Sequence, residues 1–163
     1  MSLHFHNLQV KELKRETAKT VSIGFQIPDN LKAEFQYEAG QYLTLKAMIN
    51  GEDVRRSYSI SSYGDEALQV SCKVVDGGKM STFLVNELGL GDRVEVMPPM
   101  GNFTLKTVNH PLVLFAAGSG ITPIFSILKK ALKEGNSDIK LFYGNRSEDE
   151  IIFKAAIEAL KVQ

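Results

Sequence analysis

Four consecutive residues, Arg56-Ser57-Tyr58-Ser59, combine a permanent cation, an aromatic ring and small hydroxyl groups at the end of a predicted strand. A guanidinium can grip a pyrophosphate through a fork of donors, and a phenol ring can stack on a flat heteroaromatic ring. A hydroxyl nearby can hydrogen-bond the N5 edge of an isoalloxazine, where hydride arrives. The segment therefore suits a bound flavin, although an edge strand with solvated arginines and an exposed tyrosine would show the same residues.

A glycine-rich turn, Gly77-Gly78-Lys79-Met80-Ser81-Thr82, comes immediately before a short segment with helical spacing. The free backbone N–H groups and the dipole at a helix start can hold a phosphate without side-chain charge. Glycine lets the backbone approach such a ligand closely. The alternative is an ordinary turn in which Ser81 caps the helix.

A second glycine pair lies in Gly118-Ser119-Gly120-Ile121-Thr122-Pro123, which joins an apolar run to a predicted helix. A short glycine pair between a buried strand and a capped helix is typical of a pyrophosphate or nicotinamide site. We expect Thr122 to cap the helix and Pro123 to occupy its first position, where no N–H is needed. The candidate nucleotide contacts are Gly118, Gly120, Thr122 and Pro123.

Other features of the composition restrict the possible partners. The chain has 19 basic and 19 acidic side chains, so its charge indicates neither a nucleic-acid nor a membrane partner. Its single cysteine, Cys72, excludes an internal disulfide or a cluster held by four thiolates of this chain. The three histidines lack the spacing of a metal site. With no long apolar run and no signal-peptide core, we expect a cytoplasmic protein.

Apolar residues alternate through about Pro99, which predicts six short strands and hence a closed antiparallel barrel. Phe83, Leu84 and Leu88 predict one inserted helix over 81–88. The expected strands are Leu8 to Leu13, Val21 to Phe25, Leu43 to Ala47, Val54 to Ile60, Leu68 to Val74 and Arg93 to Val96.

After Pro111 the pattern changes to strand, helix, strand, helix. The run Leu112 to Ala117 has no polar interruption, as in a parallel strand buried on both faces. A helix after Pro123, a strand over Ile139 to Tyr143 and a helix over Phe153 to Leu160 complete the order. This is the opening of a doubly wound sheet, so we expect two domains, residues 1–107 and a partial α/β domain over 108–163.

The order of these motifs resembles the ferredoxin–NADP reductase family, in which an FAD-binding barrel precedes a nicotinamide-nucleotide domain. The segments R-x-Y-S, G-G-K-M-S and G-x-G-x-T-P occur here in the family's order, and Pro99 to Phe103 looks like its P-x-G-x-F link. The resemblance implies that Arg56, Tyr58 and Ser59 contact the flavin and that Lys73, Val74 and Val75 line its tail. It also implies that Gly78, Lys79, Met80 and Ser81 surround the pyrophosphate.

The stretch Tyr143 to Ser147, followed by Ile151 to Phe153, resembles reductase components of multicomponent oxygenases, especially the phenylacetyl-CoA oxygenase reductase type. The resemblance implies that Asn145 and Arg146 meet the adenosine end of the nucleotide and that Arg146 recognises a 2′-phosphate. Arg146 could equally be solvated beside acidic residues, because Ser147 and Glu150 form a capping-box pattern that needs no ligand.

The resemblance implies an FAD-dependent reductase that takes electrons from NADPH or NADH and passes them to an iron–sulfur or haem acceptor. That acceptor would lie on another chain or on a segment beyond this one. Tyr58 and Ser59 are the residues expected near the reacting flavin atoms, since the cofactor carries the redox chemistry. A flavin reductase using flavin as a diffusing substrate and a non-catalytic flavin-binding module remain alternatives.

Overall fold

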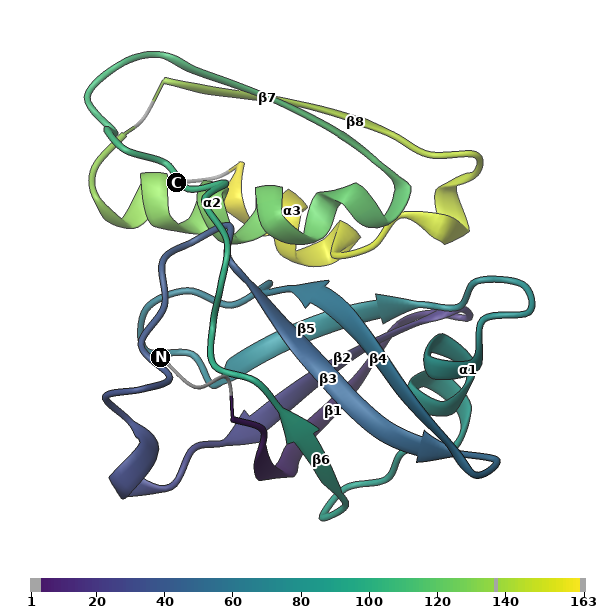
Figure 1. Cartoon of the computed structure of the whole chain (residues 1–163). Coiled ribbons are helices and arrows are strands. Elements are labelled where there is room, and N and C mark those ends of the chain that lie inside the picture. Colours follow the sequence, from purple (N-terminus) through teal and green to yellow (C-terminus); the bar gives the residue numbers. More distant parts are fainter. Residues whose placement is uncertain (1–3, 137, 162–163) are drawn as a thin grey trace.

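The computed structural model describes residues 4–136 and 138–161, and the chain forms two stacked parts (Figure 1). A curled antiparallel sheet with one helix makes up the first part. A parallel pair of strands with two helices makes up the second. No helix within the described residues is long and apolar enough to cross a membrane.

The first part contains the six strands that the alternation predicts. Their hydrogen-bonded order is β4-β3-β6-β1-β2-β5, and an isolated bridge between Ile60 and Val70 joins the two edges, so the sheet closes into a barrel-like shape. The prediction of an antiparallel barrel is therefore confirmed. The strands are β1 (His6–Thr17), β2 (Thr20–Gln26), β3 (Tyr42–Ile49), β4 (Glu52–Ser59), β5 (Leu68–Lys73) and β6 (Arg93–Val96).

Alternating side chains of these strands fill the barrel, as the period-two pattern requires. Leu43, Leu45 and Ile23 are fully buried in this core. The inserted helix α1 (Lys79–Asn86) covers one end of the barrel with Met80 and Leu84. It begins two residues before the predicted start, directly after Gly78, and ends at Asn86 rather than at the predicted Leu88.

The second part follows the predicted order. Strands β7 (Leu112–Ala117) and β8 (Ile139–Gly144) pair in parallel, and both helices lie between them and the barrel (Figure 1). The helices are α2 (Ile121–Lys133) and α3 (Lys154–Leu160), and the short 3-10 turns are η1 (Asp29–Leu31), η2 (Gly118–Gly120) and η3 (Glu148–Glu150).

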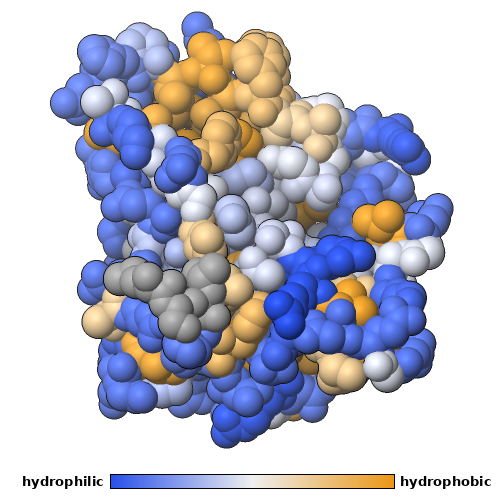
Figure 2. Space-filling view, viewed as in Figure 1, coloured by the Kyte–Doolittle hydropathy of each residue, from blue (hydrophilic) through white to orange (hydrophobic). Residues whose placement is uncertain are grey.

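The sequence predicts burial of β7 on both faces, and the structure differs. Val113, Phe115 and Phe142 are 50%, 70% and 55% exposed on the face that α2 and α3 do not cover. The rings of Phe115 and Phe142 stack there at 5.0 Å between centroids. Figure 2 shows the resulting hydrophobic surface at the β7–β8 end of the molecule. Because both helices lie on one side of the two-stranded sheet, its other side is left open.

Two predicted caps are also wrong. Gly120 stands at the cap position of α2, and Thr122 instead donates from Oγ1 to the carbonyl of Ser119 at 3.1 Å, within the first turn. Pro123 accordingly lies third in the helix. The Ser147–Glu150 capping box is absent because η3 is a single 3-10 turn without a side-chain cap. The Glu150 carboxylate binds a lysine of the barrel instead.

Helix α2 docks on the barrel through polar contacts along one side. The hydroxyl of buried Ser126 donates to the carbonyl of Ser62 at 2.7 Å. Three lysines of the same helix reach acidic residues of the barrel: Lys129 pairs with Glu66, Lys130 with Glu38 at 2.9 Å and Lys133 with Asp65 at 2.7 Å. These contacts set the position of the turn that precedes α2 relative to the barrel.

Candidate functional site

Arg56 extends from β4 with its charge available. Its guanidinium donates to the backbone carbonyl of Arg55 at 2.7 Å, and it forms no ion pair within residues 4–136 and 138–161. The neighbouring Arg55, by contrast, holds both carboxylate oxygens of Asp53, at 2.9 and 2.8 Å. Two adjacent arginines thus differ sharply, and of the two only Arg56 is free to bind an anionic ligand.

Tyr58 and Arg56 are two residues apart on β4 and therefore point to the same face of the sheet. Tyr58 packs against the barrel core beside Cys72. Burial raises the pKa of the Tyr58 phenol well above its usual value, so the ring stays neutral. A neutral, half-buried ring with one open face suits stacking on a flat ligand.

Ser57 and Ser59 point to the opposite face from Tyr58. The Ser57 hydroxyl lies 3.0 Å from Thr44 Oγ1 and is engaged across the hairpin, whereas Ser59 lies partly buried at the end of the strand. The barrel closes at this tip of β4, because the next residue, Ile60, bridges to Val70 of β5.

The Gly77–Ser81 turn is held shut by its own hydrogen bonds. Ser81 Oγ accepts from the Val75 N–H and donates to the Gly78 carbonyl, each at 3.1 Å. A Cβ at Gly78 would lie 2.6 Å from Ser81 Oγ and 3.0 Å from Val75 O, so the turn has no room for a side chain. The Ser81 hydroxyl therefore shapes the turn and already has both a donor and an acceptor within it.

The two residues between these glycines and Ser81 contribute differently. Lys79 Nζ lies 2.6 Å from Glu52 in an exposed ion pair. The Met80 side chain is buried in the barrel core. Only the main chain of Met80 is therefore available to a ligand at the start of α1.

The segment after β5 lies between the barrel and the second part of the chain. Lys73 Nζ lies 2.9 Å from Glu150 Oε2 in η3. Val74 packs against the core, whereas Val75 is exposed on the surface before the glycine turn. The sequence reasoning missed Glu150 as the partner of Lys73, and residues 77 positions apart carry no local signal of such a pair.

The Gly118–Gly120 turn is open on its outer side. A Cβ at Gly118 or Gly120 would meet nothing within 4 Å, and Gly118 has a positive φ of 49°. Behind the turn, the Tyr143 hydroxyl donates to the Gly118 carbonyl at 3.0 Å and accepts from the Ile152 N–H at 3.2 Å. Tyr143 is a second residue that the sequence reasoning missed, although it precedes the predicted Asn145 and Arg146 by only a few positions.

Asn145 and Arg146 follow β8 directly. The two amide atoms of Asn145 are buried and have no hydrogen-bond partner among the described residues. Arg146 is exposed. The turn after β7, η3 and α1 all lie on the same side of the molecule (right in Figure 1), and the Lys73–Glu150 pair joins the two parts there.

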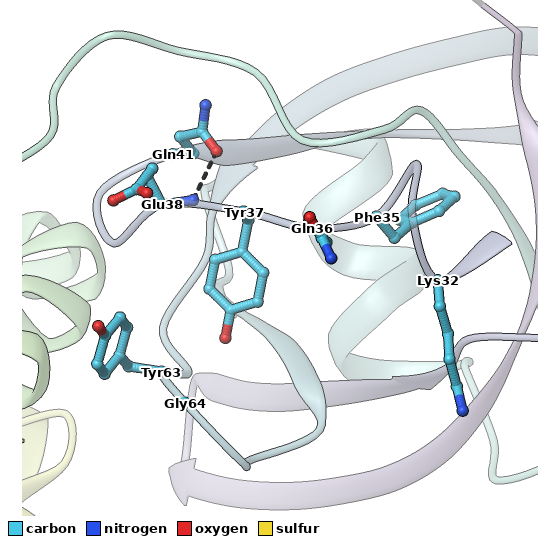
Figure 3. A pocket seen from close by; sticks show the side chains of 8 residues that line it. All are labelled: Lys32, Phe35, Gln36, Tyr37, Glu38, Gln41, Tyr63 and Gly64. Carbon is cyan, nitrogen blue, oxygen red and sulfur yellow. Dashed lines mark hydrogen bonds between the residues drawn. The ribbon is translucent and has the colours of Figure 1, made fainter. Parts of the chain in front are cut away.

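A broad groove lies away from these motifs. It encloses about 620 Å³ and includes Tyr37, Tyr63, Glu38 and Gln41 among its lining residues (Figure 3). Several of its polar groups are already paired: Gln41 Oε1 accepts from the Glu38 N–H at 2.8 Å, and the Tyr63 hydroxyl donates to Glu134 at 2.8 Å. Neither glycine turn lines it, so the size of this groove does not identify the functional site.

Comparison with protein families accounts for both parts. The family described as "Oxidoreductase FAD-binding domain" matches residues 7–105, and "Oxidoreductase NAD-binding domain" matches residues 114–163. The chain belongs to the oxidoreductase FAD-binding domain family. Its second part is the NAD-binding domain that accompanies it, and the expected cofactors, FAD and a nicotinamide nucleotide, are confirmed at this level.

The relatives of this chain include oxygenase reductase components, as the resemblance implies. The chain is 42% identical over 156 residues to the ferredoxin reductase component of 3-ketosteroid-9-alpha-monooxygenase from Rhodococcus rhodochrous, covering 94% of this chain and 44% of that protein. It is 37% identical over 162 residues to a component of 1,2-phenylacetyl-CoA epoxidase from Escherichia coli K12, covering 96% and 46%. The chain thus spans about half the length of these relatives.

A solved structure shares the fold of this protein across nearly the whole chain. The flavohem-like FAD/NAD-binding domain of nitric oxide dioxygenase from Vibrio cholerae superposes with a TM-score of 0.89 at 28% identity, covering 98% of this chain and 70% of that one. The barrel and the β7–β8 unit therefore keep their relative arrangement in a related oxidoreductase.

The candidate site residues of this chain fit an FAD molecule. The exposed guanidinium of Arg56 has no carboxylate partner among the described residues, the half-buried Tyr58 ring is neutral, and the Gly78 position excludes any Cβ. These are donors for a pyrophosphate and a surface for an aromatic ring. The chemistry of the side chains and the family assignment thus agree.

Proposed function

We propose that this chain is the flavin-binding part of an NAD(P)H-dependent reductase that delivers electrons to an iron–sulfur or haem acceptor. Bound FAD would supply the redox chemistry, taking a hydride from the nicotinamide and giving up electrons one at a time. The two functional regions correspond to our proposed domains, residues 1–107 and 108–163. The observation that carries the proposal is the contrast between Arg56, which has no acidic partner among the described residues, and the fully paired Arg55.

Each residue of the barrel site has a role in this proposal. Arg56 binds the flavin pyrophosphate, and the main-chain N–H groups from Lys79 through Ser81 bind it from a second side. Gly78 shapes this turn, because its own N–H donates to the Val75 carbonyl at 2.8 Å. Tyr58 stacks on the isoalloxazine, and Ser59 donates to its N5 edge. Lys73, Val74 and Val75 line the flavin tail, and the Lys73 ammonium is held by Glu150 at 2.9 Å.

The nucleotide domain receives the nicotinamide nucleotide at Gly118, Gly120, Thr122 and Pro123. The open space around the two glycines supports this assignment, because a pyrophosphate can approach the backbone there. Hydride transfer depends on the position of the nicotinamide, and an error of about 1 Å costs on the order of a hundredfold in rate.

We also propose that NADPH is preferred to NADH, with Arg146 at the 2′-phosphate. The acidic residues that follow Arg146 are partly neutralised, since Glu148 pairs with Lys154 and Glu150 with Lys73. Replacing Arg146 with alanine should lower the affinity for NADP⁺ and leave that for NAD⁺ nearly unchanged. An equal loss for both nucleotides would contradict this assignment.

Relatives support the electron-acceptor class. The Rhodococcus protein is named a ferredoxin reductase component, and the Vibrio domain is a flavohem-like domain of nitric oxide dioxygenase. An iron–sulfur or haem group on another chain or segment is therefore the proposed acceptor. Its identity and a cytoplasmic location remain predictions.

The experiment is anaerobic stopped-flow mixing of the FAD-loaded chain with NADPH while the flavin absorbance is recorded. We expect reduction that is slow but clearly faster than that of free FAD at the same concentration, and complete reduction by dithionite. Reduction no faster than that of free FAD would overturn the proposed reductase role.

A further inference from the structure

The Tyr143 hydroxyl connects two loops at the carboxyl ends of β7 and β8. It donates to the Gly118 carbonyl at 3.0 Å and accepts from the Ile152 N–H at 3.2 Å. Its ring lies partly buried against the core of the second part, and burial raises the pKa of the phenol, so the donating proton is retained. One side chain therefore ties the turn before α2 to the segment that leads into α3.

The bond to Gly118 fixes the direction of the next amide. In a planar trans peptide the carbonyl and the following N–H point in opposite directions, and the described chain has no cis peptide. Holding the Gly118 carbonyl toward Tyr143 therefore sends the Ser119 N–H away from it. Thr122 Oγ1 holds the Ser119 carbonyl at 3.1 Å and directs the Gly120 N–H by the same geometry.

The Gly118 carbonyl is held by two donors, because the Ile121 N–H also donates to it at the start of α2. A Cβ at Gly118 or Gly120 would meet no described atom within 4 Å beyond the chain neighbours, and glycine samples both signs of φ freely. Without the Tyr143 bond, the Ile121 N–H is the remaining donor, so the Gly118–Ser119 peptide tilts more easily and can present its carbonyl to an incoming phosphate. A carbonyl oxygen repels an anion that the N–H attracts.

The neighbouring Asn145 does not hold the Gly118 turn. Both amide atoms of Asn145 are buried without a hydrogen-bond partner in the described part of the chain. Among the described residues, the side-chain hydrogen bond from the end of β8 to the Gly118 turn thus comes from the Tyr143 hydroxyl rather than from the Asn145 amide.

We propose that Tyr143 is a positioning residue for the dinucleotide, acting through Gly118 without touching the ligand. Its hydroxyl holds the turn in the state in which the Ser119 and Gly120 N–H groups can face a pyrophosphate. The inference rests on the proposed function, which places the nicotinamide nucleotide at this turn.

The test compares Tyr143→Phe with Tyr63→Phe. Both variants lose one phenolic hydroxyl, and Tyr63 donates to Glu134 at 2.8 Å on the barrel side of α2, away from the Gly118 turn. NADP⁺ affinity is measured by calorimetry, FAD affinity by fluorescence quenching and amide exchange at Ile152, whose N–H donates to the Tyr143 hydroxyl, by NMR. Tyr143→Phe should bind NADP⁺ about fivefold more weakly, as expected for one lost hydrogen bond.

The same variant should show faster exchange at Ile152 even without nucleotide, because its N–H loses the hydroxyl acceptor, and FAD affinity should be unchanged. Tyr63→Phe should leave all three readouts at wild-type values. Equal NADP⁺ affinity in Tyr143→Phe and wild type would overturn the positioning role alone. A parallel loss of FAD binding would also overturn it, because the hydroxyl would then act on the whole fold. If the wild type itself binds no NADP⁺, the proposed function fails, and the inference fails with it.

Discussion

The ammonium group of Lys73 lies 2.9 Å from the carboxylate of Glu150, and this pair joins the end of β5 to the 3-10 turn after β8. The side chains are only 22% and 24% exposed. At the other end of the interface, the lysines of α2 hold the barrel through more exposed acidic partners. Of the ion pairs between the two described parts, the Lys73–Glu150 pair is therefore the one in which both side chains are less than a quarter exposed.

Replacing Glu150 with glutamine should lower the thermal unfolding midpoint, because the charge of Lys73 loses its partner at a partly buried site. Glu148→Gln is the matched control, since Glu148 pairs with Lys154 within the second part and is 78% exposed. Differential scanning calorimetry at low and high salt measures both variants. The Glu150 effect should persist at 1 M salt better than the Glu148 effect, because solvent-exposed pairs are screened over about 3 Å there. Equal shifts for both variants would contradict the special role of Glu150.

The same pair predicts a pH dependence. The hydrogen bond and charge of Lys73 lower the pKa of Glu150 below its usual value. A carboxyl whose folded-state pKa is lowered stabilises the fold above its unfolded pKa of about 4.3 and loses that contribution as the pH falls through the folded value. The stability difference between wild type and Glu150→Gln should therefore be constant near neutral pH and shrink below about pH 4. A difference that grows on acidification would contradict the assignment.

Arg56→Ala should weaken FAD binding by roughly ten- to a hundredfold, because a charge-assisted phosphate contact contributes about 1.5 to 3 kcal/mol. Arg55→Ala provides the control, since its guanidinium is already occupied by Asp53. Titration of flavin fluorescence measures both affinities. If the two variants lose affinity equally, general charge rather than a specific contact at Arg56 explains the binding.

Gly40→Ala should destabilise the fold much more than Gly51→Ala. Both glycines have positive φ, 97° and 79°, but a Cβ at Gly40 would lie 1.9 Å from Phe103 O while one at Gly51 would meet nothing within 4 Å. Gly51→Ala should therefore cost only the left-handed strain of about 1 to 2 kcal/mol. Urea unfolding checks the order, and similar midpoints for the two variants would show that the backbone near Phe103 can move aside.

Cys72 should be unreactive in the folded protein. The thiol is fully buried in the barrel, and burial raises its pKa to about 11, so very little thiolate forms at neutral pH. A disulfide reagent such as dithiobis(nitrobenzoate) should label the Cys72 thiol slowly in buffer and rapidly in denaturant. Rapid labelling of the native protein would show that the end of the barrel opens.

Much of this architecture follows from the sequence because its signals are local. The alternation of Leu43 and Leu45 identifies β3. Helical spacing identifies α1 and α2, although each begins two residues before its predicted start, at Lys79 and Ile121. The three motifs predicted from the resemblance lie on the elements expected for them. Their detailed ligand contacts remain predictions.

The sequence does not predict the contacts between residues that are distant along the chain. The pairing of Lys73 with Glu150 depends on how the two parts stack, whereas the capping-box pattern within Ser147–Glu150 indicates a local partner instead. The role of Tyr143 depends on the parallel register that sets β8 beside β7, which brings its hydroxyl to Gly118. The apolar run of β7 indicates burial on both faces, but helices cover only one of them.

The most direct test of the central claim is the amount and kind of flavin that the purified chain retains. The protein is incubated with an excess of FAD or of FMN and desalted, and the flavin is quantified by its absorbance after denaturation. Two separate regions, Arg56 and the Gly78 turn, are assigned to a pyrophosphate, which FMN lacks. We predict one FAD per chain and little FMN, whereas no retained flavin, or equal retention of both, would contradict the account.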